Sequence, residues 1–303
     1  MTNNVTPSNN GADLFPAPSQ NGNHLPIPKE IRAMEHVKRM RGGSQPQLMR
    51  CSDGRYYVVK FPNNPQGSRV LFNDLLGSRL AALLGLPVAT ATVVVVERRL
   101  IDLSAEMTIE HRRGRSPCQA GKCFGSRVPV DPRRSQVYDL MPFSEVGNPL
   151  DFLGMLVFDK WTCNADGRQV VFFRQGESPE LTAVMIDQGF CFNSSEWNFP
   201  DSPLRGRYYL PRVYDSVNSM DRFEPWLSRL ESEIDEKSIL AAAEGIPAEW
   251  YESDANSLAR LLERLNSRRC KVRELLWSAW KSDARLFPNW LAPSSPKGRA
   301  ASA

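Results

Sequence analysis

Apolar residues in the first third of the chain follow two periodicities. Residues 49–61 and 88–97 are dominated by β-branched and aromatic side chains, which is typical of strands, and an Asp-Gly pair at 53–54 marks a hairpin turn. Residues 68–84 carry leucines at helical spacing, and Gly85 then provides a stop signal. We therefore expect strands of one sheet with an amphipathic helix packed on it.

A second apolar helix is predicted near the middle of the chain. Asn148 is a good N-cap residue, Pro149 suits the first helical position, and Asp151 places a negative charge in the first turn. The apolar residues that follow indicate a largely buried helix that ends near Cys163.

The remainder of the chain predicts a hairpin and then helices. Residues 170–173 and 181–186 are two short apolar segments joined by a Gly-Glu-Ser-Pro turn. Residues 219–284 have helical spacing, including one continuous helix over 257–276. A small region of sheet thus precedes a mostly helical region.

Residues 112–134 are polar and rich in glycine and proline, which predicts a long irregular excursion. Positive charge concentrates in this segment, although the formal net charge of the 303 residues is only +4. The arginines concerned are Arg112, Arg113, Arg115, Arg133 and Arg134. Such runs usually form solvated loop faces, and nucleic-acid binding is the weaker alternative.

Composition divides the chain into four segments. Residues 1–25 are mostly Asn, Pro, Ser and Gly, which cannot bury enough apolar surface to offset the entropy of ordering, so we expect a disordered tail. We expect a flexible tail over 286–303, an N-terminal lobe over 26–141 and a C-terminal lobe over 142–285.

The chain has the composition of a soluble globular protein, with 41% apolar residues. It has neither a run of about 18 apolar residues nor the start of a signal peptide, so we expect a cytoplasmic protein without a membrane partner. The six cysteines are scattered, and the three histidines do not cluster with them. Reduced thiols are therefore expected rather than a zinc site.

Two aspartates at the ends of the predicted hairpin are candidates for chemistry. A hairpin returns its second strand to the level where the first began, so Asp187 should lie close to Gln169 and Asp166. Neighbouring carboxylates are costly unless a cation or a proton neutralises their repulsion, and magnesium is the simplest answer. By spacing alone, a surface turn at Asp166 and a turn cap at Asp187 remain equally good interpretations.

The N-terminal lobe adds residues that suit phosphate. Gly42, Gly43 and Ser44 precede the first predicted hairpin, where unobstructed backbone amides could close over phosphates. Lys60 ends an apolar strand and has reason to reach inward, although edge strands also use lysine to block aggregation. Asp74 lies on a helix face with small neighbours, so it could pair with Lys60 or remain solvated.

This ordered set of motifs resembles the HipA-like kinases, distant relatives of phosphatidylinositol kinases and of the protein-kinase fold. The resemblance covers residues 34–277. It is strongest at 159–169 (Asp-Lys-Trp-Thr-Cys-Asn-Ala-Asp-Gly-Arg-Gln) and at 186–192 (Ile-Asp-Gln-Gly-Phe-Cys-Phe). It implies an α+β, bilobal protein-kinase-like fold, with a sheet-rich N-lobe and a mostly helical C-lobe.

The resemblance also implies roles for the N-lobe residues. Gly42, Gly43 and Ser44 would cover the phosphates of ATP. Lys60 would bind the α- and β-phosphates, and Asp74 would orient Lys60. These assignments fit a reaction that depends mainly on positioning and charge neutralisation.

The resemblance also implies roles for residues between the two lobes and in the C-terminal lobe. Residues 138–141, including Leu140 and Met141, would form the hinge whose backbone binds adenine. Asp166 would be the catalytic base or would orient the acceptor hydroxyl, and Asp187 would be the main magnesium ligand. The implied activity is ATP- and magnesium-dependent transfer of the γ-phosphate to a protein or small-molecule hydroxyl.

Two positions depart from the family pattern. Asp74 replaces the usual glutamate, so the helix must lie closer to Lys60 or a water must bridge the two side chains. Val171 stands five residues after Asp166, where related kinases usually place an asparagine. The second magnesium ligand would then be Gln169, Asn164 or absent. A nucleotide-binding pseudokinase that acts as an interaction module is therefore an alternative to an active kinase.

The acceptor is not identified by the sequence. Acceptor-facing loops are expected within residues 190–215, but this segment carries no readable motif. Its aromatic residues are interpreted as packing residues: Trp197, Phe199, Tyr208 and Tyr209.

Overall fold

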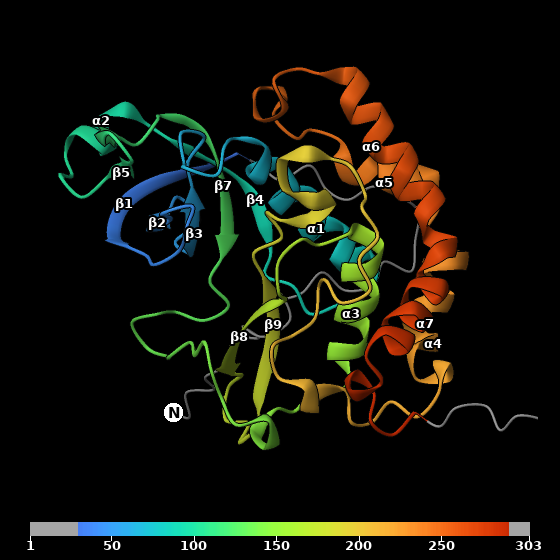
Figure 1. Ribbon diagram of the computed structural model, residues 1–303. Coiled ribbons are helices and arrows are strands. Elements are labelled where there is room, and N and C mark those ends of the chain that lie inside the picture. The colour runs from blue at the N-terminus through green and yellow to red at the C-terminus, as the bar shows by residue number, and fades with distance from the viewer. Residues whose placement is uncertain (1–29, 291–303) are drawn as a thin grey trace, which may run out of the picture.

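The computed structural model describes residues 30–290 and has a sheet-rich part, a helical part and a short two-stranded hairpin. Figure 1 shows the sheet-rich part on one side, the helices on the other and helix α1 between them. The tail predicted over 1–25 lies outside the described residues. The start of the tail predicted over 286–303 is wrong, because Leu286, Phe287 and Trp290 are buried in the main core; residues 291–303 lie outside the described residues.

The N-terminal sheet closes into a barrel with the strand order β1-β2-β3-β7-β4. Antiparallel pairs join successive strands, and β1 closes the ring by pairing in parallel with β4. The strands are β1 (Ile31–Arg39), β2 (Gln47–Cys51), β3 (Tyr56–Lys60), β4 (Ala91–Val96) and β7 (Gly121–Arg127). The hairpin turn and the strands expected within 49–61 and 88–97 are confirmed.

The irregular excursion predicted over 112–134 is wrong, because this segment contains β7. Strand β7 lies between β3 and β4, and a Cβ atom on its Gly125 would lie 2.4 Å from a methyl carbon of Val94. Glycine here therefore permits close packing against the neighbouring strand β4 and does not mark a turn. Strands β5 (Thr108–His111) and β6 (Gly114–Pro117) form a separate hairpin at the outer edge.

Helix α1 (Arg69–Leu83) occupies the predicted position, but it is not amphipathic. Almost every residue from Val70 to Ala81 is buried, including the polar Asn73, Asp74 and Ser78. The helix lies between the barrel and the C-terminal helices, so it has no broad solvent face (Figure 1). Its buried polar groups consequently need partners within the protein.

Helix α3 (Asp151–Thr162) begins three residues after the predicted N-cap. The Asn148 side chain instead binds the backbone N–H and C=O of Ala183 in β9, at 2.8 and 3.0 Å. Strands β8 (Gln169–Arg174) and β9 (Leu181–Ile186) form the predicted antiparallel hairpin. Asn148 thus fixes the start of α3 to this hairpin.

The C-terminal helices cover the outer side of α3. The helix expected over 257–276 is interrupted, because a 3-10 turn at Arg269–Lys271 separates α6 from α7. The remaining helices are α2 (Arg98–Asp102), α4 (Glu224–Ser228), α5 (Glu236–Ala243), α6 (Ala255–Arg268) and α7 (Val272–Ser282). Asp235 and Asp254 cap α5 and α6 through their side chains, which satisfies backbone N–H groups at those helix starts.

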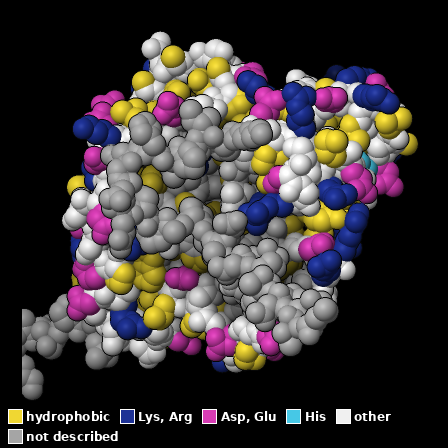
Figure 2. All heavy atoms as spheres, turned by 180° about the vertical axis from the view of Figure 1, so that it is seen from behind, with side chains coloured by type: hydrophobic (Ala, Val, Ile, Leu, Met, Phe, Trp, Pro, Cys, Tyr) yellow, Lys and Arg dark blue, Asp and Glu magenta, His cyan; other side chains and the backbone are white. Residues whose placement is uncertain are grey.

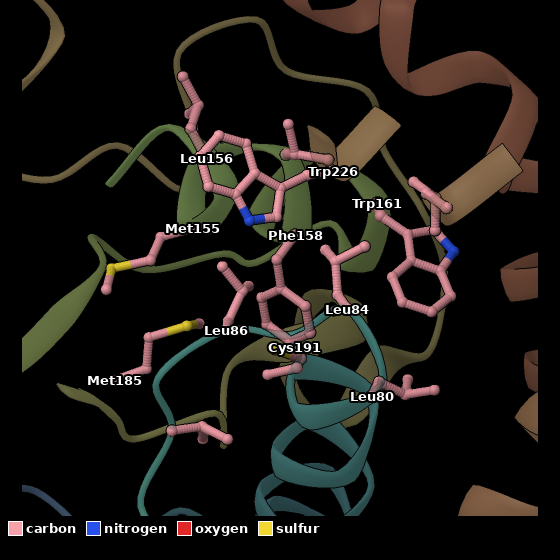
Figure 3. Close-up of a cluster of buried hydrophobic side chains, with 14 of the residues drawn as sticks. Leu80, Leu84, Leu86, Met155, Leu156, Phe158, Trp161, Met185, Cys191 and Trp226 are labelled. Carbon is pink, nitrogen blue, oxygen red and sulfur yellow. The ribbon is translucent and has the colours of Figure 1, made fainter. Parts of the chain in front are cut away.

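One apolar core joins α1 to the C-terminal helices. In Figure 3, the ring of Phe158 from α3 lies between Leu84 and Leu86, which follow α1. Trp226 of α4 packs so close to Gly154 of α3 that a Cβ atom on Gly154 would lie 2.3 Å from the indole ring. This packing fixes α1 relative to α3.

All six cysteines are free thiols, as expected. No helix of residues 30–290 has both the length and the apolar composition needed to span a bilayer. Within the same residues, no group of three or more His, Cys, Asp or Glu side chains could hold a metal by itself.

Candidate active site

A buried lysine joins the two halves of the molecule. The Nζ atom of Lys60, at the end of β3, lies 2.8 Å from Oδ2 of Asp74 in α1 and 2.9 Å from Oδ1 of Asp187. Asp187 directly follows β9, so barrel, helix and hairpin meet at one ammonium group. The direct contact to Asp74 needs no bridging water, because α1 lies close enough for the shorter carboxylate.

Burial and charge act in opposite directions at this triad of Lys60, Asp74 and Asp187. Burial lowers the pKa of Lys60, but the two carboxylates outweigh it and raise the pKa above its ordinary value. Burial likewise raises the pKa of Asp187, yet Lys60 brings it below its usual range. Burial raises the pKa of Asp74 to about 6, since hydrogen bonds from Lys60 and from the Gln188 backbone only partly offset it. The triad therefore holds Lys60 as ammonium and Asp187 as carboxylate.

Asp187 retains freedom to bind a further cation. Its backbone φ of 57° lies in the left-handed region, which turns the chain sharply after β9. Its side chain is 30% exposed, against 1% for Asp74. Lys60 donates to Oδ1, and the backbone N–H of Gly189 also interacts with the carboxylate, whose partial exposure leaves it accessible to a ligand.

The loop after α3 presents Asp166 to solvent. Cys163 ends the helix in a left-handed conformation, with φ of 51°. Asn164 is buried, donates to Asp159 at 2.9 Å and accepts the backbone N–H of Asp166 at 3.1 Å. Asp166 itself is exposed, and its Oδ2 atom lies 3.4 Å from Nε2 of Gln169. Asn164 thus fixes the backbone of Asp166, and its side-chain oxygen is occupied by that hydrogen bond.

Arg168 connects this loop to the end of β9. Its buried guanidinium donates to both oxygens of Asp159, to the carbonyl of Ile186 at 3.0 Å and to Oε1 of Gln188 at 3.3 Å. Ile186 and Gln188 flank Asp187, so one side chain fixes both the loop that carries Asp166 and the turn that carries Asp187. A charged side chain this well satisfied is a rigid support.

The predicted hairpin geometry places Gln169 beside Ile186. The side chain of Gln169 is exposed, and its Oε1 atom has no hydrogen-bond partner among the described residues. The corresponding Oδ1 atom of Asn164 already accepts the backbone N–H of Asp166. Val171 is buried with Ala89, Phe173 and Val184 in a small apolar cluster, so it contributes no polar atom to the site.

The segment Gly42, Gly43 and Ser44 lies between β1 and β2. Gly42 adopts φ of 136°, which favours glycine, and a Cβ atom on Gly43 would lie 2.7 Å from Nε2 of Gln66. Among the described residues, no hydrogen bond or ion pair joins this loop directly to the triad.

Leu140 and Met141 lie in the segment that connects the two parts of the molecule. Tyr138, just before them, exchanges two backbone hydrogen bonds of 2.8 Å with Phe172 of β8. Leu140 is 66% exposed, and the N–H groups of Leu140 and Met141 make no backbone hydrogen bond within residues 30–290. The segment therefore runs beside the apolar cluster around Val171 with free backbone donors.

Several arginines of segment 112–134 have acidic partners. Arg115 lies 2.8 Å from Glu110, and Arg133 lies 3.6 Å from Glu35. Figure 2 shows Lys and Arg side chains interspersed with Asp and Glu on the face that it presents. These contacts do not favour the nucleic-acid alternative, which needs clustered positive charge.

Sequence reasoning missed three supporting residues: Asp159, Arg168 and Asn73. Asn73 donates to the carbonyls of Gly189 and Ser194 at 2.8 Å each and accepts from the Trp197 indole at 2.8 Å. For Asp159 and Asn73 the available signal was a polar residue within an apolar helix, because a buried polar residue requires partners.

Comparisons with known proteins agree with this geometry. A family model described as HipA-like kinase matches residues 33–278. No curated protein matches the chain.

Two solved kinase structures are similar in fold. The Helicobacter pylori proinflammatory kinase CtkA has a TM-score of 0.54 and 15% identity, covering 83% of this chain and 99% of that one. The Golgi casein kinase has a TM-score of 0.50 and 11% identity, covering 82% of this chain and 74% of that one. At these identities the likeness shows the fold alone, and it confirms the predicted α+β kinase-like architecture.

Proposed function

The chain belongs to the HipA-like kinase family, and we propose that this phosphotransferase uses ATP and magnesium to phosphorylate a hydroxyl group. The observation that carries the proposal is the contact of one buried ammonium, on Lys60, with carboxylates from α1 and from the end of β9. Positive charge held at a fixed point between two parts of a protein suits the phosphates of a nucleotide. A reducing compartment such as the cytoplasm suits the six free thiols.

The nucleotide would bind between the barrel and the hairpin. Adenine would lie on the apolar cluster of Val171 and Val184, with its polar edge at the free backbone groups of Leu140 and Met141. Lys60 would bind the α- and β-phosphates. Gly42, Gly43 and Ser44 would cover the phosphates from the turn between β1 and β2.

Asp187 and Gln169 are the residues that would hold magnesium. Asp187 offers a partly exposed carboxylate, and Gln169 offers an exposed amide oxygen one strand position away. One or two protein oxygens suffice, because magnesium fills its octahedron with water and phosphate oxygens. When bound, the ion would neutralise phosphate charge. Asn164 is better placed to support Asp166 than to act as a ligand.

Asp166 is proposed to receive the acceptor proton. The hydroxyl oxygen forms a bond to the γ-phosphorus, the bond between that phosphorus and the β–γ bridging oxygen breaks, and ADP leaves with the electron pair. The hydroxyl proton passes to the Asp166 carboxylate, whose exposure leaves it accessible to the acceptor. Arg168 and Asn164 hold the loop in place during transfer.

The test separates nucleotide binding from transfer. Asp187→Ala should abolish the magnesium dependence of ATP binding in calorimetry. Asp166→Asn should keep ATP binding but reduce transfer of labelled γ-phosphate about 10²- to 10⁴-fold. Asp221→Asn changes an exposed aspartate of the C-terminal part and should match the parent. Unchanged transfer by Asp166→Asn would overturn its assigned role.

Val171 favours a second candidate, the nucleotide-binding pseudokinase. A buried valine occupies the position where related kinases place a metal-binding asparagine, so the metal site has fewer oxygen donors. A parent protein that binds ATP, yet transfers phosphate to neither itself, nor water, nor any candidate acceptor, would support this alternative.

A further inference from the structure

A pocket of about 410 Å³ opens beside Asp166. Residues 165–167 of the loop that follows α3 form one wall, and the segment 204–209 forms another. Pro211 and Leu286 complete the lining. A second substrate in this pocket would lie next to the proposed proton acceptor.

The wall at 204–209 is held in place by its backbone. Lys160 donates to the carbonyls of Pro203 and Arg205 at 2.6 and 2.7 Å, and Arg168 donates its backbone N–H to the carbonyl of Arg207 at 3.0 Å. Gly206, with φ of 74°, lies so close to α3 that a Cβ atom would be 2.5 Å from the Cβ of Asp159. The pocket shape is therefore set by α3 and by the loop that carries Asp166.

Two of the lining residues are arginines whose guanidinium groups keep free donors. Arg207 donates Nε–H to the carbonyl of Leu204 at 2.9 Å, and its other near contact is Asp283 at 3.9 Å. Arg205 donates through one nitrogen to Asn193 at 2.8 Å. Within residues 30–290, each of the two guanidinium groups thus retains an NH₂ group without a hydrogen bond, which suits carboxylate or phosphate oxygens.

An aromatic side chain borders the same opening. Tyr209 is 55% exposed, and its ring packs in a tilted arrangement on the buried Tyr208, with ring centroids 4.6 Å apart. Tyr208 is fixed in turn, because its backbone N–H donates to the hydroxyl of Tyr214 at 2.9 Å. A rigid, exposed tyrosine provides contact area for a peptide at little cost in entropy.

We propose that this pocket binds the acceptor, and that the acceptor is a peptide segment with acidic side chains next to the hydroxyl that is phosphorylated. The hydroxyl reaches Asp166, and the neighbouring carboxylates pair with Arg205 and Arg207. Exposed Leu204 and Tyr209 leave the pocket open, so a peptide can continue out of it on either side. This inference rests on the proposed function for the assignment of Asp166.

Binding of a labelled peptide tests the inference without requiring transfer. The probe is a fluorescein-labelled peptide with one serine between glutamates, and its matched control carries glutamines instead. Arg207→Gln and Arg205→Gln should each raise the dissociation constant of the glutamate peptide, measured by fluorescence anisotropy, roughly 10-fold. This is the change expected when one charge-assisted hydrogen bond is lost. Arg212→Gln removes an exposed arginine outside the pocket lining and should bind like the parent.

Each outcome is read against MgATP binding of the same variants. Preference for the glutamate peptide, lost in both pocket variants while MgATP still binds, supports the inference. Equal affinity for the two peptides overturns it, and so does an equal loss in Arg212→Gln. Competition by glycerol 3-phosphate with no peptide binding would replace the peptide with a small phosphate ester. If the parent protein itself did not bind MgATP, that result would count against the proposed function alone.

Discussion

At the scale of single residues, two carboxylates bind one ammonium group but differ in their freedom. Asp74 is enclosed and Asp187 is partly exposed. Lys60, buried between them, was recognisable in the sequence because a lysine that ends an apolar strand needs a reason to be there. The partners could be suggested only as neighbours of the right charge, since the closeness of α1 to β9 depends on the whole core.

Replacing Lys60 should affect phosphates and not adenine. Lys60→Met should weaken ATP binding much more than adenosine binding, because the lost contact is with phosphate oxygens. Calorimetry with both ligands measures the difference, and Lys38→Met, an exposed lysine of β1, is the control. An equal loss for ATP and adenosine would indicate a collapsed barrel instead.

The raised pKa of Asp74 predicts a pH effect on stability. Its pKa of about 6 in the folded protein exceeds the ordinary aspartate value of 3.8, so the folded state binds more protons between these two pH values. The stability that this group contributes is present below pH 4 and is lost as pH rises through 6. Asp74→Asn removes the titration. Urea unfolding at pH 4.5 and pH 7 should therefore show the parent losing stability relative to the variant at the higher pH, and a constant difference would contradict the assignment.

At the scale of elements, the guanidinium of Arg168 connects the loop that carries Asp166 to the turn that carries Asp187. Arg168→Met leaves Asp159 charged and unpaired in the core, which should cost about 3–5 kcal/mol in the free energy of unfolding. Asp159→Leu combined with Arg168→Met removes both charges and should be less destabilised than the single variant. Urea denaturation checks this, and additive losses would argue against direct coupling.

Strand β7 depends on Gly125. Gly125→Ala should destabilise the protein by about 1–3 kcal/mol, because the added methyl meets Val94 of the neighbouring strand β4. Val94→Ala in the same chain removes the clashing methyl carbons and should recover part of the loss. Thermal unfolding of the single and double variants measures the coupling. Absence of any recovery would place the strain elsewhere.

The elements that sequence patterns identified were those whose own residues carry the signal. β2, β3, β4, α1, β8 and β9 follow from composition and spacing. β7 was hidden because its glycines serve neighbouring strands, and the start of α3 was misplaced because Asn148 binds β9. Likewise, Arg205 and Arg207 line a pocket only through the fold of segment 204–211, which no local pattern records.

At the scale of the whole molecule, α1 belongs to the same apolar core as α3. The two helices should therefore open together, and their slowest amides should exchange hydrogen with the same free energy. The β5–β6 hairpin has its own two-stranded sheet at the outer edge and should exchange faster. Mass spectrometry of native-state hydrogen exchange measures this, and earlier opening of α1 than α3 would contradict it.

Asn73 has a further consequence, because it ties α1 to the chain that follows Asp187. Its side chain bonds the carbonyls of Gly189, Cys191 and Ser194 and the indole of Trp197, all from inside the helix. Together with the hydrogen bond from the Gln188 backbone to Asp74, these contacts fix α1 to the turn that carries Asp187. The two carboxylates that receive Lys60 therefore move as one unit, and any displacement of the barrel would carry the ammonium away from both together.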